Sequence, residues 1–258
     1  MTTWVIAWNT IGEALRKKIL VVFLVVALAL IVLSVSFSQF SFREELTIIK
    51  SLGLGLIAIV GMLISIVLGI NLITAEVERK TIYTILSKPV RRYEFLLGKF
   101  FGALGTILIN LLIMTVVFMS MIAWKNHWHP DWALLKGVLM IFFQLFILSS
   151  ITLVFSVFAT PVLNFFMTAA VYIIGSLSDI TQSLAQKPNS NIITKGFYNS
   201  VHYLIPQFAN YFTQNPLIHP EVQIQGELRY YVFNIAYAIV YVAAVLIIAV
   251  IAFERRDM

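Results

Sequence analysis

Long apolar runs alternate with short charged segments along the chain. A helix needs about 20 apolar residues to cross about 30 Å of hydrocarbon. Four apolar runs match one span each, whereas the run at 137–178 has about twice that length and contains Pro161, which ends one helix and suits the first turn of another. The pattern predicts six transmembrane helices at 19–42, 51–75, 100–124, 137–158, 162–178 and 230–253.

The runs favour helices over the strands of a β-barrel, since barrel strands alternate polar and apolar residues over about ten positions. The 258 residues are 60% hydrophobic and 12% charged, with a mean hydropathy of +0.92. Soluble domains carry about 25% charged residues. We therefore expect an all-α polytopic membrane protein with one transmembrane domain, residues 1–258.

The basic residues predict the orientation. Lys and Arg gather tightly at span ends at 16–18, 79–99 and 255–256, and they are sparser at the opposite ends. The positive-inside rule places the dense side in the cytoplasm. We expect a multi-pass protein of a bacterial inner or plasma membrane, with both termini cytoplasmic. This rule and contacts with anionic membrane lipid account for the net charge of +6, so no nucleic-acid partner is expected.

The first 17 residues have the pattern of a helix lying in the membrane interface. Trp4, Trp8, Ile11 and Leu15 recur at helical spacing, and tryptophan is favoured at the interface. A disordered leader is the alternative. A spanning run without a small-residue cleavage site follows, so this segment is not expected to be a secretory signal.

The predicted outer side contains two features. His127 and His129 form a His-x-His pair in the loop at 124–131, but structural zinc and copper sites take three or four protein ligands, and a wet interfacial loop is favoured over a metal site. The outer segment, 179–229, is too long for a simple connector. Its apolar residues around Pro206 predict short helices that lie on the outer leaflet or re-enter it.

The sequence argues against an enzyme. It has no G-x-x-x-x-G-K-[ST] phosphate loop and no cysteine. The predicted spans have no Asp, Glu, Lys, Arg or His away from their ends, and intramembrane catalysis usually needs such residues. We expect no cofactor in this chain. The best interpretation is a membrane protein that acts as a moving scaffold of helices.

The cytoplasmic segment at 76–97 is suited to binding a partner. Acidic and basic residues flank a short predicted helix at 81–86, whose apolar side carries Ile82, Ile85 and Leu86, and Pro89 follows it. Such a helix fits a groove on a soluble protein. The alternative is a membrane-surface loop whose charges only fix the topology; the mixture of apolar, acidic and basic residues favours docking.

This segment resembles the cytoplasmic signature of ABC-2 type permeases, the membrane subunits of ATP-binding-cassette exporters, and especially the branch of copper-enzyme maturation and gliding-motility permeases. The similarity rests on the acidic exit from the second span, the Thr-Ile pair, Ser87 to Val90, the basic pair with Glu94, and Leu97-Gly98-Lys99. Many permeases of the group have Gly before that Thr, where this chain has Lys80. The interfacial helix, the six spans and Ile205-Pro206-Gln207-Phe208 extend the resemblance along the chain.

The resemblance implies that this segment contains the coupling helix that receives the motion of an ATPase. The residues expected to dock the ATPase are Glu76, Glu78, Arg79, Thr81, Ile82, Ile85, Leu86, Lys88, Arg91, Arg92 and Glu94.

Small and polar residues mark faces inside the predicted spans. Gly61, Ser65 and Gly69 recur every four residues, as do Gly98, Gly102 and Thr106, which predicts close packing against neighbouring helices. In the last span one polar face consists of Tyr230, Asn234, Tyr237 and Tyr241. Hydrogen bonding between helices is the favoured interpretation of that face; the lining of a substrate path or dimer cleft is the alternative.

The expected function is that of a permease subunit of an exporter. The implied partners are two ABC ATPase subunits, which would hold the ATP and Mg²⁺, and a second permease chain, identical or related. An outer-surface or periplasmic protein is a further candidate partner. The alternative function is a non-transporting scaffold that recruits an ATPase to act on such proteins. The substrate, whether lipid, glycan, peptide, drug or a sulfur species, is left open by the sequence.

Overall fold

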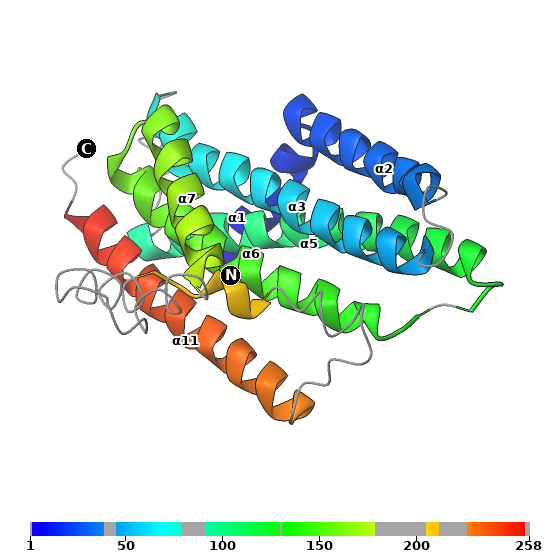
Figure 1. Cartoon of the computed structure of the whole chain (residues 1–258). Helices are drawn as coiled ribbons and strands as arrows, with labels where there is room; N and C mark the ends of the chain where they lie inside the picture. The colour runs from blue at the N-terminus through cyan, green and yellow to red at the C-terminus, as the bar shows by residue number, and fades with distance from the viewer. Residues whose placement is uncertain are drawn as a thin grey trace.

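The computed structural model describes residues 2–38, 45–78, 91–129, 131–178, 205–211 and 226–255, and every regular element in these ranges is helical (Figure 1). The elements are α1 (Thr2–Leu15), α2 (Lys18–Ser38), α3 (Glu45–Glu78), α5 (Arg92–Lys125), α6 (Leu134–Phe158), α7 (Pro161–Ser176), the 3-10 turn η1 (Phe208–Tyr211) and α11 (Glu227–Glu254). The prediction of an all-α polytopic membrane protein is confirmed.

Five of these helices are long and apolar enough to cross a membrane: α2, α3, α5, α6 and α11. The fifth predicted span, 162–178, corresponds to α7, an apolar helix of 16 residues. At 1.5 Å per residue it extends about 24 Å, less than the hydrocarbon thickness of about 30 Å. Helices α3 and α5 have 34 residues each and extend beyond the predicted spans, so positions 92–97, expected in the cytoplasmic segment, belong to α5.

The long helices lie side by side along the longest dimension of the molecule (Figure 1). We call the end that contains Glu78, Arg92 and Glu254 the proximal end, and the end that contains Lys50 and Asp131 the distal end. At the distal end the Lys50 ammonium donates to the Asp131 carboxylate at 2.7 Å, which joins α3 to the loop before α6. Lys136 and Glu227 join α6 to α11 at 2.6 Å in the same way.

Helices α3 and α6 pack closely through small residues. A Cβ placed on Gly61 would lie 2.7 Å from a Leu145 methyl, and one on Gly69 would lie 2.5 Å from Thr152. Between them the hydroxyls of Ser65 and Ser149 are hydrogen-bonded at 2.9 Å. The predicted packing role of this stripe is confirmed.

Residues 205–211 pack into the bundle rather than over its surface. η1 contacts α6 and α7 and lies part of the way along the bundle, near the end of α7 and beside α11 (Figure 1). Phe208 and Tyr211 are buried. The other residues of the predicted outer segment, 179–204 and 212–225, lie outside the described residues.

Candidate functional site

The first turns of α5 follow the predicted coupling helix at 81–86, and residues 79–90 lie outside the described part of the chain. The Arg91 backbone N–H donates to the Glu94 carboxylate at 3.2 Å, which caps the start of α5. The exposed Arg91 guanidinium donates to the Tyr93 hydroxyl at 3.2 Å, and this bond raises the pKa of Arg91 above its ordinary value. The start of α5 is therefore a fixed helix end with a permanent positive charge.

The same turns hold the C-terminal end of α11. The Arg92 guanidinium donates to the backbone carbonyls of Phe253 and Glu254, at 3.4 and 3.1 Å. These carbonyls lie at a helix C-terminus, where a cation is favourable. One turn further along, the rings of Phe95 and Phe253 stack with centroids 6.2 Å apart. Arg92 and Phe95 thus join α5 to the last span.

Glycines bring α1 against the other side of α5. A Cβ on Gly98 would lie 2.9 Å from the Thr3 carbonyl oxygen, and one on Gly102 would lie 2.7 Å from the Ala7 carbonyl oxygen and 2.5 Å from the Thr10 Cβ. The backbones of the two helices are therefore nearly in contact. The packing predicted for Gly98 and Gly102 is confirmed, and the neighbour is the N-terminal helix, whose opposite face exposes Trp4 and Trp8.

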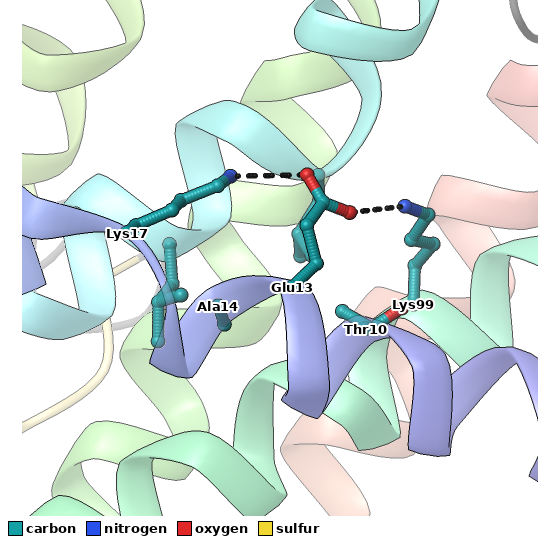
Figure 2. Close-up of a pocket in the computed structure, with 7 residues that line it drawn as sticks. Thr10, Glu13, Ala14, Lys17 and Lys99 are labelled. Carbon is teal, nitrogen blue, oxygen red and sulfur yellow. Dashed lines mark ion pairs between the residues drawn. The ribbon is translucent and has the colours of Figure 1, made fainter.

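An ion-pair cluster lies where α1 and α5 meet (Figure 2). The Glu13 carboxylate of α1 lies between two ammonium groups, 3.6 Å from Lys17 and 3.8 Å from Lys99 of α5. The side chain of Lys99 is only 9% exposed, and its ammonium lies 5.8 Å from the centre of the Phe95 ring. Leu68 and Leu72 of α3 line the same small pocket. A buried lysine needs such a counter-charge.

The arrangement concentrates contacts from three helices on about two turns of α5. Residues 91–99 contact α1 and α11, and the pocket at Lys99 includes α3, which leads into the predicted coupling helix from the other side. We call residues 91–105 of α5, with their partners on α1, α3 and α11, the junction. A displacement of the segment between α3 and α5 would reach α1 and α11 through it, because packed helices move as rigid bodies.

The predicted docking residues fall into three groups. Arg91, Arg92 and Glu94 are described and lie in the junction. Glu76 and Glu78 belong to the last turns of α3. The remaining predicted docking residues, which lie outside the described residues, are Arg79, Thr81, Ile82, Ile85, Leu86 and Lys88. Docking of an ATPase on this set stays a prediction.

The polar face predicted in the last span contacts residues 205–211. The Tyr211 hydroxyl donates to the Asn234 carbonyl at 2.8 Å, and the Tyr230 hydroxyl donates to the Asn210 carbonyl. The Tyr237 hydroxyl is bonded to the Gln207 backbone. Tyr241 is next to Tyr237, with ring centroids 5.8 Å apart. Tyr230, Asn234 and Tyr237 are thus bonded within the chain, and the role of the face as a pathway or dimer lining stays a prediction.

The His-x-His loop forms a tight turn. His127 and Trp128 have positive φ angles of 50° and 66°, and the Asn126 side chain donates to the His129 carbonyl at 2.9 Å. Among the residues that the structure describes, no group of three His, Asp or Glu side chains is placed to hold a metal ion.

Sequence reasoning did not identify the pairing of Glu13 with Lys99 or of Arg92 with the end of α11. The sequence contains one signal for the first pair. Lys99 directly follows Gly98, so the polar face of any helix that packs on Gly98 and Gly102 lies beside Lys99. The second pair joins positions more than 160 residues apart, and no local pattern indicates it.

The long apolar helices and the charged junction at one end define a polytopic membrane protein whose helices are linked at the connection between α3 and α5. Residues 4–258 match the family model described as ABC-2 family transporter protein. The chain belongs to this family and is a permease component of an ABC transporter, a membrane subunit that works with an ABC ATPase subunit. No curated protein matches the sequence significantly.

Proposed function

We propose that this chain is the permease subunit of an ATP-binding-cassette exporter and that the junction passes the motion of a separate ATPase to the transmembrane helices. The observation that supports the proposal is the linkage of α1, α3 and α11 to residues 91–99, immediately after the segment that resembles a coupling helix. A segment used only to fix the topology would not need this linkage.

The proposed orientation follows the charge pattern. The proximal end, with Arg91 and Arg92, faces the cytoplasm, and the distal end faces outward. The membrane is proposed to be a bacterial inner membrane with both termini in the cytoplasm. Two ATPase subunits and a second permease chain complete the proposed complex, because the family resemblance implies a pathway between permeases.

The proposed mechanism has three steps. ATP binding closes the ATPase pair and displaces the coupling helices. Each displaced segment moves the end of α3 and the start of α5, and Arg92 and Lys99 carry the movement to α11 and α1. The helices then rock against one another, and the path between the two permeases opens outward.

The test is reconstitution. The chain is purified with its co-purifying ATPase in mild detergent and placed in liposomes, and ATP hydrolysis and movement of a labelled lipid or peptide across the bilayer are measured together. The proposal expects ATP-dependent movement that stops when the Walker lysine of the ATPase is replaced. Hydrolysis that responds to an outer-surface protein without any movement of label would instead support the non-transporting scaffold.

A further inference from the structure

Gln144 of α6 carries a buried amide with one unpaired end. The side chain is 1% exposed, and its Nε2 donates to the Tyr172 hydroxyl of α7 at 3.4 Å. No described residue donates a hydrogen bond to Oε1. Exchanging the two amide atoms gives the same result, since one end still contacts Tyr172 and the other has no partner.

A second buried amide in the same helix pair shows the contrast. Asn164 of α7 donates to the Thr152 carbonyl at 3.1 Å and accepts from the Thr168 hydroxyl at 3.0 Å, so both ends of its amide are bonded. Buried polar groups are normally paired in this way. Gln144 is thus not an ordinary interhelical contact.

The depth of Gln144 makes the unpaired end costly. It lies ten residues after Leu134, which is about 15 Å along the helix at 1.5 Å per residue and near the middle of a hydrocarbon layer of about 30 Å. An unsatisfied polar atom costs about 1–3 kcal/mol, and water is scarce at this depth. An apolar residue at position 144 would avoid this cost. The presence of the amide is explained if its Oε1 is hydrogen-bonded to a partner in another state of the protein.

Residues 205–211 cover the Gln144–Tyr172 pair. The ring of Phe208 packs on the ring of Tyr172 with centroids 5.4 Å apart, and the Pro206 carbonyl lies close against Gly175, where a Cβ would be only 2.4 Å away. Figure 1 shows η1 at the end of α7 and beside α11. The hydrogen bond from Tyr211 to the Asn234 carbonyl fastens this cover to α11.

The surroundings define the chemistry of the missing partner. Residues 137–178 and 205–211 contain no Asp, Glu, Lys, Arg or His, so a charged group would find no counter-charge among them. A hydroxyl group can donate to the amide oxygen and also accept from Tyr172. On its far side α7 exposes apolar side chains such as Phe166 and Ile173, which suit an acyl chain.

We propose that Gln144 and Tyr172 form a binding subsite for the neutral, hydroxyl-bearing part of an amphipathic molecule, and that residues 205–211 cover this subsite. The proposal rests on the proposed transport function, since it places the polar part of a substrate inside one permease chain. Release of the hydrogen bonds that join residues 205–211 to α11, among them the bond from the Tyr211 hydroxyl to the Asn234 carbonyl, would open the subsite.

The test is photolabelling of the full chain in nanodiscs without an ATPase, so its result does not depend on the docking prediction. The probe is a monoacylglycerol with a diazirine near its ester, and the control probe is the matching acyl methyl ester, which has no hydroxyl. The labelled peptides are identified by mass spectrometry. We expect the monoacylglycerol, and not the ester, to label α6, α7 and residues 205–211.

The variants make the result specific. Gln144→Leu and Gln144→Met keep the side-chain volume and should lower this labelling at least about fivefold, whereas Tyr211→Phe should raise it about twofold or more, because one hydrogen bond is worth about 0.5–1.5 kcal/mol. Ser65→Ala removes the buried hydrogen bond between α3 and Ser149 of α6 and should leave labelling unchanged. Equal labelling by both probes, unchanged labelling in both Gln144 variants, displacement of the label by free glycerol, or no labelling would each overturn the proposal.

Discussion

Glu13 of the N-terminal helix and Lys99 of α5 form an ion pair of 3.8 Å that joins the first residues of the chain to the helix following the predicted coupling segment. The Lys99 side chain is nearly buried, so the pair is less screened by solvent than an exposed one. Lys17 shares the same carboxylate at 3.6 Å, and its own side chain is 28% exposed.

A double-mutant cycle tests this pair. Glu13→Gln and Lys99→Met, alone and together, should give a coupling energy of about 1 kcal/mol in thermal or denaturant unfolding, near the upper end for partly exposed pairs. The matched cycle with Lys17→Met should give about 0.3–0.5 kcal/mol, as for ordinary i,i+4 helix pairs. Equal coupling energies in the two cycles would show that the contact with Lys99 does not differ from a surface pair.

The approach of α1 to α5 predicts a second effect. Gly102→Ala would place a Cβ within 2.7 Å of the Ala7 carbonyl oxygen, so the helices must separate, at a cost of about 1–3 kcal/mol for an overpacked site. We expect a lower Tm and weaker stimulation of ATP hydrolysis in the complex. Gly12→Ala is the control, because a Cβ there meets nothing within 4 Å and Ala favours a helix by about 1 kcal/mol. An unchanged Tm in Gly102→Ala would contradict the close packing.

The sequence predicted the fold well because a membrane-spanning helix is specified locally. Apolar length alone located α2, α3, α5, α6 and α11, since each span must satisfy its own backbone hydrogen bonds. The positions of the spans do not show how the connection between two spans runs. For the residues around Pro206 the sequence leaves two options, lying on the outer leaflet or re-entering it, and the structure packs residues 205–211 against α6 and α7.

The candidate site was less predictable for a related physical reason. Gly98 and Gly102 indicated close packing but not the partner, since any helix can lie on a small-residue stripe. The bonds from Arg92 to the end of α11 depend on tertiary contacts between distant parts of the chain. The polar face at Tyr230 was recognised, whereas its contacts with Asn210 and Tyr211 arise only from folding.

Membrane topology can be tested directly, because the chain contains no native cysteine. Single cysteines at Ser87, His127 and Asn189 should divide into two classes toward impermeant thiol reagents added to intact cells. We expect labelling at positions 127 and 189 and protection at 87, which should become reactive after the cells are opened. Labelling of Ser87→Cys in intact cells would reverse the proposed orientation.

Nucleotide binding provides a further test. The sequence has no phosphate loop, and such a loop is what cradles the phosphates in the ATPase subunits of this transporter class. The purified chain should therefore show neither ATP hydrolysis nor stoichiometric binding by calorimetry. Activity should appear when the co-purifying ATPase is added, and stoichiometric binding by the isolated chain would refute the assignment of ATP to the partner.

The central claim is that an ATPase docks on the segment between α3 and α5 and drives the junction. The most direct measurement is co-purification of the ATPase with the Ile82→Asp/Ile85→Asp variant, alongside its stimulated ATP hydrolysis. Burial of each isoleucine contributes about 1.5–3 kcal/mol, so two charged replacements should abolish the complex while the chain still inserts with its normal topology. The matched control is Ile82→Val/Ile85→Val, which keeps both side chains apolar and should keep the complex. A stable and fully active complex from the Ile82→Asp/Ile85→Asp variant would show that the ATPase docks elsewhere.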